Sequence, residues 1–189
     1  ATNDSKKLRG AIITFVAGQA PDLDRIYDIA KRYGIILIED CRSSLGGTYK
    51  GKKIGNLRAD MTIFSTNPSN SKYAISRSGV IVTNNEDIAN RAKLLRTHAL
   101  TTTYDSYGNL DYVYDVVDIG HKYDLSELDA AYALAQLNKT EKFIKRRKEI
   151  AKLYESRLSG VKHITILPHK EEHIFTQFII KISRNRDAF

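Results

Sequence analysis

Two short apolar runs in the sequence end in side chains that can do chemistry. Residues 35–38 are apolar and lead into Glu39 and Asp40, and the run MTIFS ends in Ser65. In open α/β sheets ligands lie outside the carboxyl ends of the strands, so we expect Asp40 to face a cofactor. An acid in this position can instead cap the following turn. The hydroxyl of Ser65 suits a phosphate or a ring substituent, and the two strand ends together predict a site.

A second motif fits a metal site. HKEEH at residues 169–173 matches the H-x-x-E-H pattern, in which two histidines on one helix face bind zinc and a glutamate acts as base. Pro168 and the alternating run 175–182 instead favour a turn that enters a strand. We therefore expect no metal site. The single cysteine, Cys41, has no evident histidine partner and is expected to be a small core or pocket residue rather than a nucleophile.

The elements that must position Asp40 and Ser65 alternate between strands and helices. Apolar runs predict strands, and apolar positions three and four residues apart predict helices. The predicted strands are residues 11–16, 35–38, 61–64 and 80–82, and the predicted helices are residues 22–33 and 86–98. On the first helix we expect Leu23, Ile26, Ala30 and Tyr33 to share the core face. This order implies parallel strands joined by crossovers, and therefore an α/β sheet, although residues 66–78 are polar and predict a loop.

The pattern changes after about residue 101. Residues 101–115 have no sustained period and predict a long loop or linker. Two helices are expected next, over residues 126–138 with Ser126 as N-cap and over residues 140–158 closing at Gly160. We expect three parts: a partial large α/β domain at 1–100, a linker at 101–125 and a partial small domain at 126–189. Because the chain begins with alanine and stops inside an apparent helix, a fragment or trimmed chain is expected.

Composition limits the classes of protein and of partner. The 189 residues are 42% hydrophobic and 28% charged, as in soluble globular proteins. One cysteine, no apolar run of about 20 residues and no signal peptide favour the cytoplasm and exclude a membrane anchor. The net charge of +8 favours anionic partners. The run KRRK at 145–148 is expected to be a solvated helix face, and without a nucleic-acid motif we expect no nucleic-acid partner.

Three blocks of the sequence resemble the DegT/DnrJ/StrS family of pyridoxal-phosphate-dependent sugar aminotransferases. Residues 17–57 are similar to the stretch from the family's A-G-Q turn through I-E-D-A-A-H-A-x-G-x-x-Y-K-G-x-x-x-G. Residues 79–100 and 118–158 resemble its G-x-V-V-T and G-Y-N-Y-R-x-T-D segments, in the same order. The resemblance implies part of a fold-type-I large domain, with a mainly parallel sheet and flanking helices, and the start of a smaller C-terminal α+β domain.

The resemblance also implies roles for individual residues. Asp40 matches the aspartate that pairs with the cofactor's pyridine nitrogen, and Ser65 matches a serine that contacts its phosphate. Ser43 replaces the histidine of D-A-A-H and is assigned to the cofactor pocket, and Arg42 replaces a small residue there. No residue is assigned to a metal.

This chain has no lysine at the position where the family pattern places its catalytic lysine. The pattern F-S-F-x-x-x-K places the lysine six residues after Phe64, where this chain has Asn70, and the lysine present is Lys72. A loop shift would bring Lys72 to the cofactor aldehyde as a catalytic and cofactor-binding residue, and the alternative is a surface lysine. Asp124 replaces a neutral or basic residue and would repel a phosphate.

For the whole protein the resemblance implies amino transfer to a keto sugar on a nucleotide, for cell-surface polysaccharide or glycoconjugate biosynthesis. It implies an amino donor, pyridoxal phosphate and a homodimer with pockets shared between subunits. The matched blocks span about half of the family's length and lack its phosphate loop and stacking aromatic residue. We therefore expect this chain alone not to retain the cofactor stably. The alternative function is that of a non-catalytic relative kept as a dimerisation or binding module.

Overall fold

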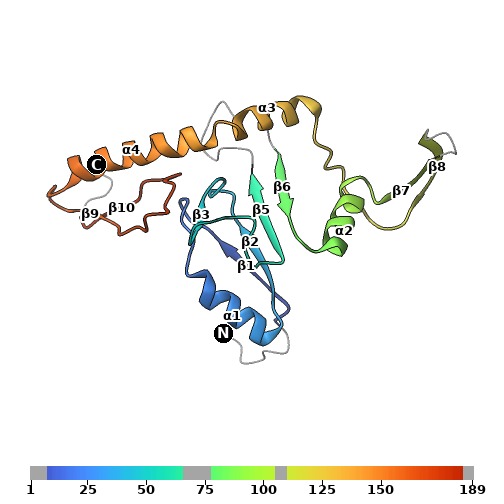
Figure 1. Cartoon of the computed structure of the whole chain (residues 1–189), viewed down its shortest axis with the longest axis horizontal. Coiled ribbons are helices and arrows are strands. Elements are labelled where there is room, and N and C mark those ends of the chain that lie inside the picture. The colour runs from blue at the N-terminus through green and yellow to red at the C-terminus, as the bar shows by residue number, and fades with distance from the viewer. Residues whose placement is uncertain (1–7, 66–77, 105–109, 185–189) are drawn as a thin grey trace.

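A four-stranded sheet forms the centre of the protein (Figure 1). The computed structural model describes residues 8–65, 78–104 and 110–184. The strands are β1 (Gly10–Thr14), β2 (Ile36–Asp40), β5 (Met61–Ser65) and β6 (Gly79–Val82), in the order β1-β2-β5-β6. The first three are parallel, whereas β6 is antiparallel to β5. The antiparallel β6 departs from the parallel arrangement that the alternation of strands and helices implied, and the loop expected over residues 66–78 lies almost entirely outside the described residues. The predicted α/β fold class is confirmed.

One face of the sheet packs against α1 (Leu23–Tyr33). Leu23, Tyr27 and Ala30 are buried with Leu37 and Phe64 in one hydrophobic cluster. A helix turns about 100° per residue, so Tyr27 lies about 40° from Leu23 and Tyr33 about 80° from it. The prediction that Tyr33 belongs to the core face is therefore wrong, because its side chain is 57% exposed. Tyr27 is the tyrosine that packs on the core face of α1.

Alternation along the strands divides polar side chains between the two faces of the sheet. Glu39 points toward α1 and is fully buried. One of its carboxylate oxygens accepts a hydrogen bond from the Tyr27 hydroxyl, and the other accepts one from Thr62 Oγ1 at 3.0 Å. Burial raises the pKa of Glu39, while the two hydrogen bonds lower it. The three side chains tie α1, β2 and β5 together.

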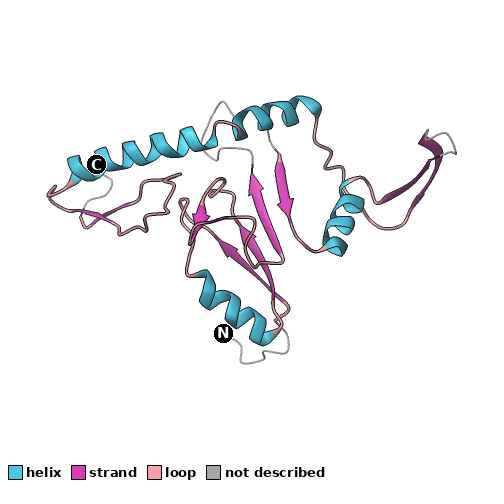
Figure 2. Ribbon diagram, in the orientation of Figure 1, coloured by secondary structure: helices cyan, strands magenta, loops and turns pink. Residues whose placement is uncertain are grey.

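The remaining elements extend beyond this sheet. They are β3 (Thr48–Tyr49), β4 (Lys52–Lys53), α2 (Glu86–Arg96), β7 (Leu100–Tyr104), β8 (Leu110–Val116), α3 (Glu127–Leu137), α4 (Thr140–Leu158), β9 (Ile164–Ile166) and β10 (Ile180–Ile182). The arrowhead of β5 points toward the side on which α3 and α4 lie, and the β7–β8 hairpin projects from the body (Figure 2). The Ser126 side chain caps α3 by accepting from Asp129 N at 3.1 Å, which confirms the predicted cap. No described helix combines the length and apolar composition needed to span a membrane.

Two predictions of local structure are wrong. Residues 101–115, expected to be an irregular loop, contain most of the antiparallel β7–β8 pair, because threonine and tyrosine suit paired strands. The strand expected over 175–182 is confined to Ile180–Ile182. Phe175 has a positive φ of 50°, and the backbone just before it bonds to another part of the chain instead of pairing as a strand.

The Tyr27 hydroxyl provides a test of how this core is held. Replacing Tyr27 by phenylalanine leaves one oxygen of the buried Glu39 without its donor, and we expect the free energy of unfolding to fall by about 1–3 kcal/mol. The measurement is urea unfolding followed by circular dichroism. Tyr33→Phe, on the exposed side of the same helix, is the control and should change stability by less than about 0.5 kcal/mol. Equal effects of the two substitutions would contradict the role given to the hydroxyl.

Candidate functional site

Asp40 and Ser65 lie at the same edge of the sheet. Asp40 ends β2 and is the register partner of Ile63 in β5, so Ser65 follows two residues farther along the neighbouring strand. On its other side Asp40 is the register partner of Thr14, the last residue of β1. Because register partners point to the same face, these polar side chains lie on the face opposite Glu39 and α1. The structure thus brings together two residues that the sequence predicted as a site.

The carboxylate of Asp40 is held by its neighbour Arg42. Arg42 Nε donates to Asp40 Oδ1 and Arg42 Nη2 donates to Oδ2, each at 2.8 Å. These hydrogen bonds lower the pKa of Asp40 below its usual value, while burial acts in the opposite direction. Asp40 is therefore ionised at neutral pH. An ionised carboxylate at this edge has the chemistry needed to accept a hydrogen bond from a protonated ring nitrogen.

Ser43 belongs to a tightly held loop, residues 41–47. The loop begins with Cys41 N donating to Ile63 O at 2.8 Å, so it continues directly from the sheet. Gly46 has a φ of +83°, and a Cβ there would lie 2.5 Å from Thr140 Cγ2 at the start of α4. Only glycine fits this approach. The loop that carries Ser43 is therefore held beside Asp40 by a backbone hydrogen bond to β5 and by close packing against α4.

A segment from the C-terminal part, the C-terminal strap of residues 169–176, crosses this loop. Thr176 Oγ1 donates to Ser43 O at 3.0 Å. The strap also binds residues 17–19: Ile174 N donates to Gly18 O at 3.1 Å and Lys170 N donates to Gln19 Oε1 at 2.9 Å. Sequence reasoning missed these contacts, since nothing local in residues 169–176 signals a partner some 150 positions away.

The HKEEH motif forms part of this strap. It is not helical, which confirms the predicted turn. His169 Nε2 pairs with Glu155 in α4, and His173 Nδ1 accepts from Phe175 N at 2.9 Å. The two imidazole rings lie 5.8 Å apart in an edge-on arrangement. Within residues 8–65, 78–104 and 110–184, no three histidine, cysteine or acidic side chains form a group suited to a metal ion. That no metal binds stays a prediction.

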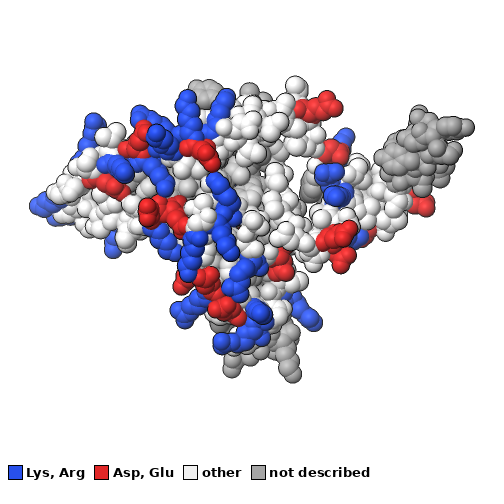
Figure 3. All heavy atoms as spheres, viewed as in Figure 1, with Lys and Arg blue, Asp and Glu red and all other residues white. Residues whose placement is uncertain are grey.

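The basic run at 145–148 is only partly a solvated face. Lys145 and Arg146 are exposed, whereas Arg147 and Lys148 are half-buried. Lys148 Nζ donates to Glu171 O at 3.0 Å and so joins α4 to the strap. Blue lysine and arginine side chains, interspersed with acidic ones, are dense over the half of the molecule that contains α4 (Figure 3).

Cys41 follows Asp40 but belongs to the core. Its side chain is fully buried, and burial raises the pKa of the thiol. The thiolate needed for a nucleophile is therefore disfavoured. The prediction of a small core residue is confirmed.

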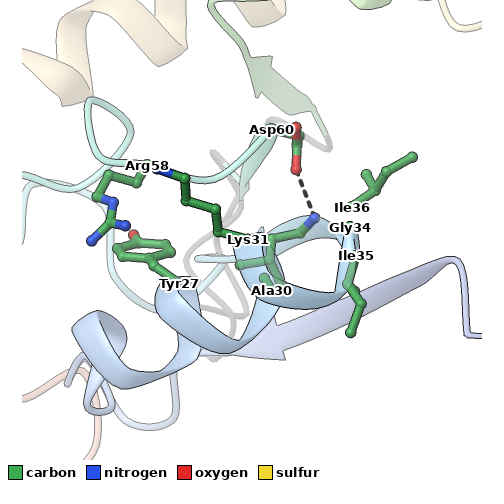
Figure 4. A pocket seen from close by; sticks show the side chains of 9 residues that line it. Tyr27, Ala30, Lys31, Gly34, Ile35, Ile36, Arg58 and Asp60 are labelled. Atoms are coloured by element: carbon green, nitrogen blue, oxygen red, sulfur yellow. Dashed lines mark hydrogen bonds between the residues drawn. The ribbon is translucent and has the colours of Figure 1, made fainter. Parts of the chain in front are cut away.

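A cavity of about 530 Å³ lies at the opposite edge of the sheet. Asp60 Oδ2 accepts from Leu37 N at 2.8 Å beside it, near the beginning of β2 and β5 (Figure 4). Its lining consists of Tyr27, Ala30, Lys31, Gly34, Ile35, Ile36, Leu37, Arg58 and Asp60. Because these residues stand at the amino ends of the strands, the cavity is separate from the site at Asp40.

The predicted catalytic lysine, Lys72, lies outside the described residues, as does Asn70, which stands where the family pattern has its lysine. The site that the structure describes therefore consists of Asp40 with Arg42, Ser65 and the loop bearing Ser43. These residues lie at the carboxyl edge of a mostly parallel sheet, in the α/β fold of fold-type-I aminotransferases.

Comparison with known proteins identifies the family. The family model described as the DegT/DnrJ/EryC1/StrS aminotransferase family matches residues 4–189, and the chain belongs to this family. The chain is 34% identical over 149 residues to a UDP-4-amino-4,6-dideoxy-N-acetyl-beta-L-altrosamine transaminase of Campylobacter jejuni, covering 77% of this chain and 37% of that protein. It is 33% identical over 174 residues to an uncharacterized protein of Methanocaldococcus jannaschii, covering 90% and 44%.

A solved structure shows the same fold. A DegT DnrJ EryC1 StrS aminotransferase from Brucella abortus superposes with a TM-score of 0.77 at 26% identity. The match covers 95% of this chain and 45% of that one. The chain thus spans less than half the length of these relatives.

The burial of His173 in the strap leads to a prediction of how the stability of the protein depends on pH. Burial lowers the pKa of His173, with the nearby His169 and Lys148 acting in the same direction. The unfolded chain therefore binds more protons just below the ordinary histidine pKa of about 6.5, and stability should fall as pH drops through that value. Replacing His173 by glutamine should flatten this dependence.

The measurement is the urea midpoint at about pH 7.5 and about pH 5.5, chosen on either side of the ordinary histidine pKa. The exposed His121 offers a control, and His121→Gln should keep the wild-type difference between the two midpoints. A His173→Gln protein with the wild-type difference would show that burial of this imidazole does not set the pH response.

Proposed function

We propose that this chain is part of an enzyme that uses pyridoxal phosphate to transfer an amino group to a keto sugar linked to a nucleotide. The observation that carries the proposal is the ionised Asp40 beside Ser65 at the carboxyl edge, in a chain of an aminotransferase family. A relative named for a UDP-linked amino sugar supports the substrate class. The net charge of +8 suits a nucleotide diphosphate.

The proposed role of Asp40 is to hold a proton at the ring nitrogen of the cofactor. When bound, the cofactor supplies an electron-accepting ring that stabilises a carbanion on the substrate. Ser65 would hold the phosphate through its hydroxyl, and Ser43 would line the pocket. We assign Lys72 to bond with the cofactor aldehyde and to move the proton of the substrate, for which an amine of lowered pKa is required.

The assembly is also part of the proposal. Val116 ends β8 of the projecting hairpin, Ile119 and Leu128 follow it, and the three residues are 63%, 87% and 85% exposed. Apolar side chains this exposed favour contact with another subunit, which supports a homodimer with shared pockets. We propose a large domain at residues 1–100 and the beginning of a small domain at 126–189, with residues 101–125 connecting them. The single cysteine agrees with a cytoplasmic location.

Borohydride reduction with pyridoxal phosphate tests the assignment of Lys72. We expect the modified peptide, mapped by mass spectrometry, to contain Lys72 when the chain is expressed within its complete coding sequence. The 189-residue chain alone should show no specific labelling, because the family's phosphate loop and stacking aromatic residue are not in it. Lys72→Ala should abolish labelling, whereas Lys52→Ala, at an exposed position in β4, should not.

The same preparation should be assayed for amination of a UDP-linked keto sugar with an amino-acid donor. Specific labelling at another lysine would contradict the role of Lys72. Absence of both labelling and amination in the complete protein would favour the non-catalytic alternative.

A further inference from the structure

The guanidinium of Arg42 occupies the oxygens that the proposed cofactor needs. Its Nε and Nη2 bind the two oxygens of Asp40 at 2.8 Å each, and the backbone nitrogen of Arg42 approaches Oδ1 at 3.3 Å. The Asp40 side chain is only 13% exposed, so few directions remain from which another donor can reach it. This paired geometry places both ends of the carboxylate in contact with one cation.

A second cation cannot join this pair without opposition. Arginine stays protonated at all physiological pH values, and Asp40 raises the pKa of Arg42 further. A protonated ring nitrogen at Asp40 would therefore lie within a few ångströms of a fixed positive charge, and like charges at that distance repel. Either Arg42 leaves the carboxylate or the ring nitrogen stays unprotonated.

The Arg42 side chain is exposed enough to move off the Asp40 carboxylate. That side chain is 66% exposed, whereas Asp40 is anchored by the end of β2. Water and salt can compete for the exposed guanidinium, although not equally for the carboxylate beneath it. Rotation of the side chain into solvent would uncover Asp40 without moving the sheet.

We propose that Arg42 is an internal counter-ion of Asp40 that must move off the carboxylate before a protonated ring nitrogen can pair with it. Arg42 is thus a positioning residue that sets the affinity of the site for the cofactor. This inference rests on the proposed function, because it takes pyridoxal phosphate as the ligand of Asp40. The resemblance already marks this position, where the family motif has a small residue.

Binding of pyridoxamine 5′-phosphate to the complete protein that contains this chain tests the inference. This probe has no aldehyde and so needs no lysine, and its binding can be measured by isothermal titration calorimetry. We expect Arg42→Ala to bind about tenfold more tightly than wild type, and Arg42→Lys, which makes a single contact, to bind with intermediate affinity. Arg146→Ala, which removes an exposed ion pair with Glu149 in α4, is the matched control and should bind like wild type.

A double-mutant cycle separates competition at Asp40 from other effects of removing a charge. Asp40→Asn should weaken binding, and Arg42→Ala should bring no gain in that background. Unchanged binding by Arg42→Ala, together with weaker binding by Asp40→Asn, would overturn the role of Arg42 and leave the proposed function standing. A gain that persists in Asp40→Asn would also overturn it. No binding by any variant would overturn both the inference and the cofactor site at Asp40.

Discussion

The pairing of β2 with β5 is the constraint on which the site depends. Glu39 and Thr62 are register partners, and their hydrogen bond, completed by Tyr27 from α1, lies in the core. Side chains alternate along a strand, so a slip of one residue would bury Asp40 and expose Glu39 on the opposite face. The buried carboxylate thus specifies which of two adjacent acids reaches the site.

The site edge is stabilised from outside the sheet as well. The loop after β2 packs against the start of α4 at Gly46, where no larger residue fits. The C-terminal strap then bonds to that loop through Thr176 and Ser43 and to the turn after β1 through Ile174 and Gly18. Segments distant in the sequence therefore position the backbone around Asp40, and the C-terminal part of the chain contributes to a site that its first part carries.

Charge is balanced within the site. Asp40 is ionised and partly buried, and Arg42 supplies the positive charge that such a group requires. An enzyme that pairs this aspartate with a cationic cofactor must exchange one counter-ion for another. The identity of the residue two positions after the aspartate consequently affects how readily the exchange occurs, even though that side chain is exposed.

Local patterns in the sequence determined the strands that carry Asp40 and Ser65, the four helices of the described residues, the cap at Ser126 and the resemblance to the family, because periodicity and capping act over a few neighbouring residues. Tertiary structure decided the pairing of β7 with β8, the short β10 and the course of the C-terminal strap. In each case the outcome depends on which distant backbone or side chain competes for the same hydrogen bonds or the same buried space, and a single sequence does not record those partners.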